Sequence, residues 1–428
     1  MSMHRFLDFP LEIWIDILRS AADVPDPLVY PQLVHKWDSS TVLSQYAAQR
    51  YRDSLSTKRN LVGVCRQWYR CVVPYLYEHI SVKNREQMHS IVQAAAGLPT
   101  IRDQEDERTL GSFIRRLDLL LPGLEWEDGR FAGTTGSSYS NAPLLCSLAP
   151  NLLTIITTSD GDCNSFPLSD VISSKLEYLY WINTFSMPIP EWVDFMDKHP
   201  RLIYMDPPFF EDPDWRGQRC KADWGGWRGK SWPALEEMVF HRPRQTTIYA
   251  TEFPTGSFPG LVRMAFTYQP TISDLEEILA AHGANLKSIH FQIRPSYVNQ
   301  EERLDKVKVH CPDIKELMVT LVNLEGEGGG TPGGIAMPQI TTFCLQHASE
   351  IPMGPKDFCE DAIAWIKIFP SLREICIFEE SNVRDILEGP RDVFLGFLEN
   401  CTSLGIAVKD SQGCIIDRDR WIGTLDVQ

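Results

Sequence analysis

One pattern of apolar positions recurs along most of the chain. An apolar residue, usually leucine, is followed by apolar residues three and five positions later, and most copies start 24 to 33 residues apart. The second and third positions of each copy fall on the same side of an extended strand, so the pattern predicts a series of short strands with one buried face. The copies are Ile114-Leu117-Leu119, Leu152-Ile155, Leu176-Leu179, Leu202-Met205, Leu235-Met238-Phe240, Leu261-Met264-Phe266, Leu286-Ile289-Phe291, Ile314-Leu317-Val319, Ile340-Phe343-Leu345, Leu372-Ile375-Ile377 and a shortened Leu404-Ile406-Val408.

Several stretches between these copies have the pattern of helices. Ser273 and Glu276 have the spacing of a capping box, and Gly283 ends the helix that they would begin. Another helix is predicted between Pro190 and Pro200, with Trp192, Phe195 and Met196 turned inward. A strand–helix alternation predicts a right-handed αβ solenoid with strands on its concave face and helices on its convex face. The period and the L-x-x-L-x-L signature resemble leucine-rich repeats, although the asparagine that usually follows the strand is missing.

Near the N-terminus, residues 9–18 (FPLEIWIDIL) predict a short and unusually apolar helix. Pro10 suits a first helical turn, and Glu12, Asp16 and Arg19 form one narrow polar stripe. The remaining surface is apolar: Leu11, Ile13, Trp14, Ile15, Ile17 and Leu18. This is more apolar surface than two short helices can cover, which favours a permanent partner, whereas an ordinary three-helix core with no partner is the alternative.

A second helix, capped by Ser56 or Thr57, is predicted from the apolar spacing of Leu61, Val64, Cys65 and Trp68. A short third helix follows around Pro74, then an exit strand at residues 80–82. Asn84 can cap a further helix that ends near Gly97. Residues 22–55 separate the first two helices and are predicted to be an inserted loop, with a short helix around 41–51.

These three blocks, FPLEIWIDIL, LVGVCRQW and VVPYLYEHI, resemble the F-box family, in the fungal form whose first and second helices are separated by an insertion. The resemblance covers residues 6–82 and departs from the family at Phe9, where a leucine is common. It implies binding to the Skp-type adaptor of an SCF-type cullin–RING ubiquitin ligase, with the cullin as scaffold, while the repeats capture a protein substrate. The residues that would contact the adaptor are Pro10, Leu11, Ile13, Trp14, Ile17, Leu18, Val64, Cys65 and Trp68.

The expected organisation is therefore an α/β chain of two parts. A small all-α F-box-like domain spans residues 1–85, and an irregular leucine-rich-repeat-like αβ solenoid spans 86–428. Three polar or glycine-rich stretches interrupt the solenoid as loops, near residues 123–141, 212–232 and 326–334.

Charge and cysteine usage narrow the possible partners and compartments. Residues 1–85 carry 11 lysines and arginines against 8 acidic residues. The whole chain has 41 basic and 57 acidic residues, so the remaining residues carry 30 basic against 49 acidic ones. An acidic repeat region is a poor match for a nucleic-acid backbone. The 11 cysteines are odd in number and contain no C-x-x-C pair, which favours reduced thiols in the cytoplasm or nucleus. No secretory signal or apolar run long enough for a membrane span is expected.

No set of residues indicates catalysis, so an enzyme is not expected. The glycine-rich stretch at 326–334 lacks the lysine of a phosphate-binding loop, the histidines lack metal-ligand spacing, and Ser257 is one place too early for a nucleophile elbow. We therefore expect neither cofactor nor metal. The tryptophans of residues 212–232 alternate with basic residues, which suits either burial against the helices or an exposed binding site.

Two functions agree with these patterns. In the first, the chain is a substrate receptor whose repeats present substrate-facing positions at Tyr178, Tyr204, Arg263, Lys287, His290 and Lys315, together with Trp224 and Trp227. In the second, the chain is a protein-binding repeat scaffold without a ligase role, and the N-terminal helices only cap the solenoid. The exposure of the apolar residues of the first helix distinguishes the two, because a cap would hide them.

Overall fold

The computed structural model describes most helices and strands of the chain. The described residues are 11–22, 45–97, 109–120, 141–157, 172–181, 189–206, 229–241, 249–251, 253–293, 300–321, 335–347, 355–377, 391–410 and 413–416. The predicted loops near 123–141 and 326–334, and most of the one near 212–232, lie outside these ranges.

The chain forms two compact units, residues 1–224 and 225–428. The first unit contains the N-terminal helices together with the first five strands, so the boundary predicted at residue 85 falls inside it. Both units mix α and β structure, and all of their paired strands are parallel.

The N-terminal helices of the first unit are α1 (Leu11–Ala22), α2 (Gln45–Val62) and α3 (Arg66–Glu78). The prediction of one helix through Leu61 and Trp68 is wrong, because the chain turns at residues 63–65 and a new helix starts there. Cys65 is extended, and its Sγ accepts a hydrogen bond from the Trp68 N–H at 3.5 Å, which caps α3. The predicted third helix is the second half of α3, which continues through Pro74.

Helix α2 also corrects two details of the predicted insertion. It starts at Gln45, so the short helix predicted around 41–51 is the first part of α2, and the remaining residues up to 55, predicted as loop, are helical too. Thr57 lies inside α2 and its hydroxyl donates to the Asp53 carbonyl at 3.0 Å, so this threonine binds the preceding turn instead of capping a helix.

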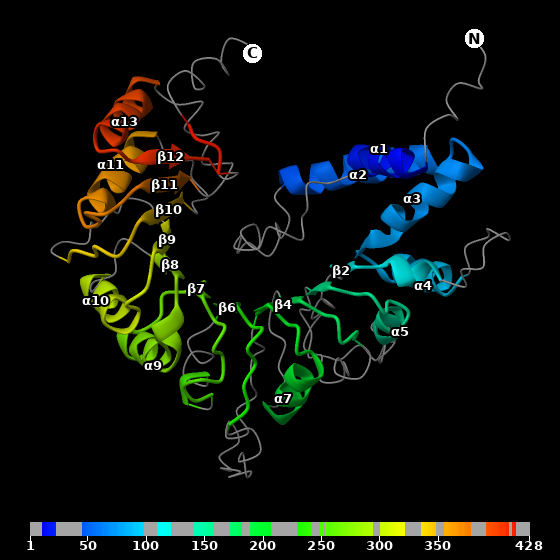
Figure 1. The fold of residues 1–428 in the computed structure, drawn as a ribbon, viewed down its shortest axis with the longest axis horizontal. Coiled ribbons are helices and arrows are strands. Elements are labelled where there is room, and N and C mark those ends of the chain that lie inside the picture. The colour runs from blue at the N-terminus through cyan, green and yellow to red at the C-terminus, as the bar shows by residue number, and fades with distance from the viewer. Residues whose placement is uncertain are drawn as a thin grey trace, which may run out of the picture. The chain divides into compact units, whose positions relative to one another are not determined.

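The strands of the first unit are β1 (His79–Val82), β2 (Arg116–Leu119), β3 (Thr154–Thr157), β4 (Tyr178–Trp181) and β5 (Tyr204–Met205). Each pairs in parallel with the next one in the chain. The connections contain α4 (Arg85–Ala96), a 3-10 turn η3 (Leu110–Phe113), α5 (Asn141–Ser147) and α7 (Ile189–Lys198). In Figure 1, α4, α5 and α7 lie on one side of these strands and α2 lies on the other.

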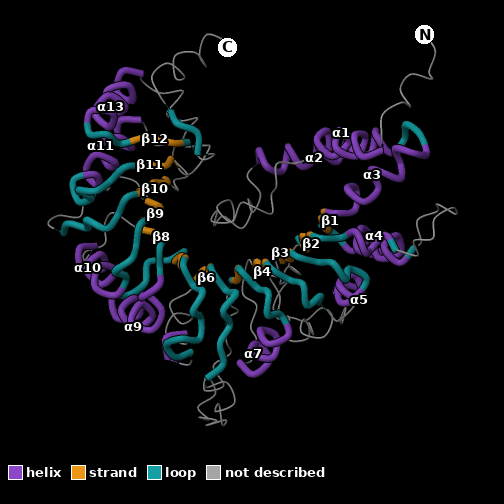
Figure 2. Tube along the Cα trace, in the orientation of Figure 1, coloured by secondary structure: helices purple, strands orange, loops and turns teal. Residues whose placement is uncertain are grey.

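The second unit repeats this arrangement. Its strands are β6 (Glu237–Phe240), β7 (Arg263–Phe266), β8 (Ser288–Ile293), β9 (Glu316–Leu321), β10 (Thr342–His347), β11 (Glu374–Ile377) and β12 (Ala407–Lys409), paired in chain order. Its helices are α9 (Ile272–His282), a 3-10 turn η6 (Gly283–Asn285), α10 (Gln300–His310), α11 (Pro355–Ile366) and α13 (Arg391–Ser403). Figure 2 shows these helices along one side of the strands, so the other strand face is free of them.

The recurring apolar positions form the cores of both units. Every residue named in the copies from Ile114 to Ile377 is buried, and the predicted strands are confirmed. The shortened last copy is the exception, since Leu404 is 56% exposed while Ile406 and Val408 are buried. Its spacing is different because Gly405 adopts a left-handed conformation (φ 71°) that turns the chain before β12.

Successive copies are stacked by a repeated backbone arrangement. At most steps one carbonyl accepts two consecutive N–H groups of the next copy: the Arg115 carbonyl accepts from residues 153 and 154, and the Glu236 carbonyl accepts from residues 262 and 263. Two of the predicted helices between the strands agree with the structure. Asn84 caps α4 through a 2.9 Å bond from the Gln87 N–H, and Trp192, Phe195 and Met196 of α7 are buried. The cap of α9 is Thr271, not Ser273.

Candidate functional site

Helix α1 is the first candidate binding element, because part of its apolar surface is left uncovered. Leu18 is 1% exposed and is part of the core of the first unit, whereas Ile13 is 42% exposed and Ile17 is 48% exposed. The Trp14 ring contacts the Trp68 ring of α3 at a centroid distance of 5.6 Å. One side of α1 therefore packs on the rest of the first unit through Trp14 and Leu18, and a different side exposes Ile13 and Ile17.

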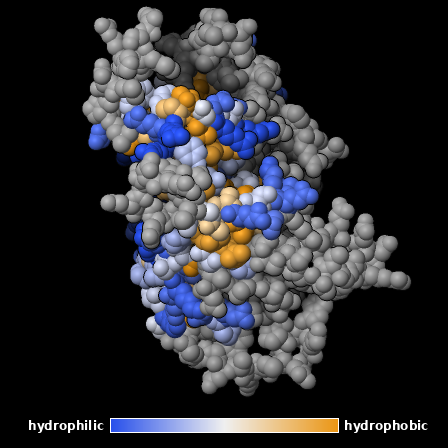
Figure 3. Space-filling view, turned by 90° about the vertical axis from the view of Figure 1, so that its right-hand side faces the viewer, coloured by the Kyte–Doolittle hydropathy of each residue, from blue (hydrophilic) through white to orange (hydrophobic). Residues whose placement is uncertain are grey.

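The turn between α2 and α3 adds to this exposed surface. Val64 is 58% exposed, and Cys65 is also exposed while it caps α3. Because Trp68 lies one turn after Cys65 and contacts α1, this turn lies next to α1. Figure 3, which views the right-hand side of Figure 1, shows hydrophobic residues at the surface among hydrophilic ones.

The residues predicted to contact an adaptor differ in their exposure. Ile13, Ile17, Val64 and Cys65 are exposed, Trp14 and Trp68 are half-buried against each other, and Leu18 is buried. Leu11 is the first residue of α1, and Pro10 lies outside the described residues.

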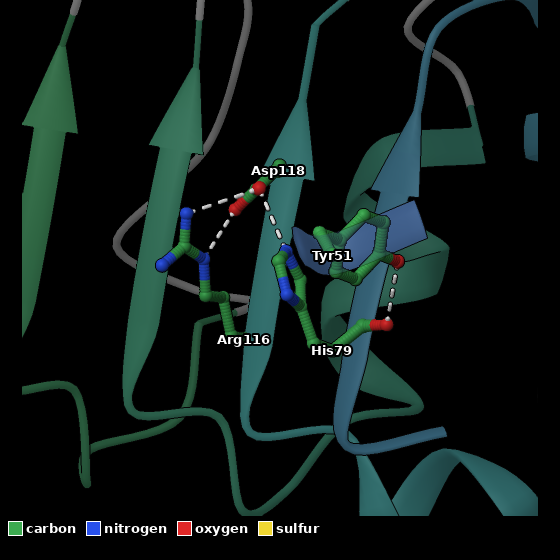
Figure 4. A network of polar contacts seen from close by, with 4 residues as sticks. All are labelled: Tyr51, His79, Arg116 and Asp118. Carbon is green, nitrogen blue, oxygen red and sulfur yellow. Dashed lines mark hydrogen bonds and ion pairs between the residues drawn. The ribbon is translucent and has the colours of Figure 1, made fainter. Parts of the chain in front are cut away.

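A buried polar network joins the N-terminal helices to the strands (Figure 4). Asp118 of β2 accepts hydrogen bonds from Arg116 Nε at 2.8 Å and from Arg116 Nη2 at 3.2 Å. Its Oδ2 also lies 2.7 Å from His79 Nε2 of β1. Tyr51 of α2 packs its ring on His79 at 4.3 Å and donates its hydroxyl to the His79 carbonyl at 3.2 Å.

The electrostatics of this network fix the protonation of each group. Arg116 is the strongest of the contacts that hold the pKa of Asp118 well below its usual value against the opposing effect of burial. A carboxylate can only accept, so His79 must carry its proton on Nε2. Burial lowers the pKa of His79, which favours the neutral imidazole, and burial raises the pKa of Tyr51 to about 12.

The network gives α2 a fixed position on the first two strands. Arg116 and Asp118 are 4% and 1% exposed, so they are closed to a ligand from outside and their role is to hold elements together. Sequence reasoning missed this network. Its only local signal was the Arg-x-Asp alternation in a predicted strand, which places both side chains on the face opposite Leu117.

The strand face opposite the core is the second candidate surface. In the first unit it carries Tyr180 and Tyr204, whose rings lie 4.2 Å apart, and the Tyr204 hydroxyl donates to Asp206 at 2.8 Å. In the second unit Arg263 Nε donates to Glu237 at 2.8 Å, and Lys409 Nζ donates to Glu374 at 2.6 Å. The polar side chains named here are therefore paired with one another, and the face that carries them is called the polar face below.

The predicted substrate-facing residues differ in accessibility. Arg263, Lys287 and Lys315 are exposed, and Lys287 Nζ pairs with Asp313 at 2.8 Å. Tyr178 is half-buried. Tyr204 and His290 are buried, and His290 Nε2 lies 2.8 Å from Thr320 Oγ1. Trp224 and Trp227 lie outside the described residues. Trp232, the described tryptophan of that stretch, is buried against Phe253 and Phe258.

Within the part of the chain that the structure describes, no three histidine, cysteine or acidic side chains gather as metal ligands would. None of the described helices combines the length and apolarity needed to cross a membrane. No family model matches this sequence, and no curated protein is similar enough to match it.

Proposed function

We propose that the chain is a non-catalytic substrate receptor of an SCF-type ubiquitin ligase, acting in the cytoplasm or nucleus. In this proposal α1 and the start of α3 bind a Skp-type adaptor, which a cullin carries, and the strand faces bind a protein substrate. The observation that carries it is the exposure of Ile13 and Ile17 on a helix whose Leu18 is buried. Exposed isoleucines one turn apart on a fixed helix are suited to a protein interface.

The strand–helix succession supports a repeat architecture for the substrate-binding part. We propose that residues 86–428 are a leucine-rich-repeat-like αβ solenoid, because strands in both units pair in parallel in chain order and are stacked through shared carbonyls. The Tyr51–His79–Asp118–Arg116 network would then hold the adaptor-binding helices at a constant orientation on the first repeats. A receptor needs such a rigid connection to present a substrate to another subunit.

Adaptor binding can be tested with purified full-length protein and a purified Skp-type adaptor. The variant carries Ile13→Asp and Ile17→Asp, and a matched control carries Val309→Asp, which changes an exposed valine of α10. We expect the α1 variant to lose at least about 100-fold in affinity by calorimetry, since two buried contacts become charged. The control is expected to bind as the parent does.

Both variants should keep the parent circular dichroism spectrum and melting temperature, because the changed side chains are exposed. Full adaptor affinity in the folded α1 variant would refute the assignment. Absence of binding by the parent chain itself would do the same.

A scaffold without ligase function is the second candidate, and one observation favours it. Helix α3 packs on β1 and on η3, and Tyr51 of α2 is bonded to β1, so these helices are part of the first unit as a cap would be. If the scaffold function is correct, the α1 variant should bind protein partners of the repeats as the parent does, and neither should bind the adaptor.

A further inference from the structure

Two cysteines lie side by side on the polar face of the second unit. Cys344 of β10 and Cys376 of β11 are register partners on adjacent parallel strands. Their neighbours Phe343, Leu345 and Ile375 are buried in the core, so both thiols point to the opposite face. Adjacent strands run about 4.8 Å apart, which lies within the Cα separation of about 4.4–6.8 Å found in disulfides.

The two thiols have different environments. Cys344 is buried, and its Sγ donates to Glu316 Oε1 at 3.8 Å. Cys376 is half-exposed, and its register partner on β12 is Lys409. An oxidant from solvent therefore reaches Cys376 first, and Cys344 lies next to it on the adjacent strand.

The charges around the pair reinforce this difference. The interaction between the two thiols raises the pKa of Cys344, to which burial adds, and the same interaction lowers the pKa of Cys376. The Lys409 ammonium also favours the thiolate of Cys376, whereas burial, Glu316 and Glu374 oppose it. Reactive thiols characteristically combine accessibility, a nearby cation and a neighbouring cysteine.

We propose that Cys376 and Cys344 are a peroxide-sensitive thiol pair, in which Cys376 is oxidised first and Cys344 then closes a disulfide between β10 and β11. In the first step the Cys376 thiolate attacks one oxygen of a hydroperoxide. The S–O bond of a sulfenic acid forms, the O–O bond breaks, and the leaving oxygen departs as hydroxide or alkoxide, which a proton from water neutralises.

In the second step the Cys344 sulfur attacks the Cys376 sulfur. The S–S bond forms, the S–O bond breaks, and the hydroxide leaves as water with the proton of Cys344. The pair loses two electrons in total, and these reduce the peroxide. The disulfide removes the thiol that donates to Glu316, so oxidation changes the polar face next to Lys315 and Glu316. This inference does not depend on adaptor binding.

The test treats the native full-length protein with hydrogen peroxide, blocks remaining thiols with an alkylating agent and analyses tryptic peptides by mass spectrometry. Lys356, Lys367 and Arg373 lie between the two cysteines, so trypsin places them on separate peptides. We expect a crosslinked peptide pair containing Cys344 and Cys376, which disappears on reduction. Cys376 should lose alkylation at least about tenfold faster than Cys359 and Cys401, two buried thiols that serve as internal controls.

Two variants distinguish the steps. Cys344→Ser should stop at the sulfenic acid of Cys376, which a dimedone-type reagent labels, and Cys376→Ser should form neither product. The proposal is overturned if Cys376 stays reduced under conditions that oxidise the exposed Cys65, if it forms sulfenic acid without the crosslink in the parent protein, or if it crosslinks to a different cysteine.

Discussion

Asp118 of β2 accepts a hydrogen bond from the imidazole of His79 on the adjacent strand at 2.7 Å, while Arg116 neutralises the same carboxylate. The register places His79 opposite Arg116, so Asp118 lies diagonally across from the histidine and both donors reach it from the same strand face. Tyr51 then covers His79 from α2. One carboxylate thereby joins the first two strands, and through His79 it orients the helix that lies above them.

Replacing Asp118 is expected to destabilise the first unit strongly. Asp118→Ala leaves a buried guanidinium without its counter-charge, which typically costs about 3–5 kcal/mol of unfolding free energy. The measurement is urea denaturation of the full-length protein, followed by fluorescence and circular dichroism.

Two companion variants control for this effect. Tyr51→Phe removes one hydrogen bond to a carbonyl and should cost only about 0.5–1.5 kcal/mol. The double variant Arg116→Met, Asp118→Leu removes both charges and should recover much of the loss. If Asp118→Ala were as stable as Tyr51→Phe, the network would not be holding the unit together.

The sequence was sufficient to predict the strands, because their period-two apolar pattern reflects burial directly. Leu117 and Leu119, and the same positions in the later copies, are buried on one face as expected. The sequence was not sufficient to predict the junction between α2 and α3. The stripe through Leu61 and Trp68 agrees with one helix, but the chain turns at Gly63, and the Cys65 side chain then caps α3.

The polar network could not be predicted for a different reason. Tyr51, His79 and Asp118 come from separate segments, and their contact depends on how α2 lies on the strands. The exposure of Ile13 and Ile17 was expected from the width of the apolar stripe, but the burial of Leu18 on the same helix follows only from packing.

Gly260 lies where the backbones of two successive copies approach each other closely, and its replacement gives another prediction. A Cβ at Gly260 would lie 2.1 Å from the Pro233 carbonyl oxygen, so the backbone must move to accept any side chain. Gly260→Ala is expected to destabilise the second unit by about 1–3 kcal/mol, as overpacked sites do.

The matched control is Gly396→Ala. Gly396 lies inside α13, and apart from the adjacent backbone of this helix no atom lies within 4 Å of the new Cβ, so alanine should stabilise by up to about 1 kcal/mol through helix propensity. Thermal denaturation of the two variants side by side should give shifts of opposite sign. Equal shifts would contradict the close packing at Gly260.

A buried histidine predicts acid sensitivity of the second unit. Burial lowers the pKa of His282, whose Nε2 lies 3.2 Å from the Tyr249 carbonyl oxygen. The folded state therefore prefers the neutral ring, and the unfolded chain binds more protons below its ordinary pKa of about 6.5. Stability contributed by this group is present above that pH and is lost as the pH falls towards the folded pKa, by up to about 1.4 kcal/mol per pH unit.

The check is urea denaturation at several pH values between about 5 and 8. His282→Gln keeps a donor for the carbonyl and should flatten this part of the profile, even if the variant is less stable overall. Replacing the exposed His89 by glutamine serves as the control and should leave the profile unchanged. A parent-like slope in His282→Gln would assign the acid sensitivity to another group.

The first apolar position of each copy gives the last prediction. Leu261 is fully buried at the turn into β7, and Leu261→Ala should cost about 2–5 kcal/mol, since it removes buried methyl groups and leaves a cavity. Leu404 has the corresponding position in the shortened copy but is 56% exposed, so Leu404→Ala should change stability by less than about 0.5 kcal/mol. Denaturation midpoints of the two variants measure the difference. A large loss at Leu404 would mean that this leucine is covered in solution, because an exposed side chain has no buried contacts to lose.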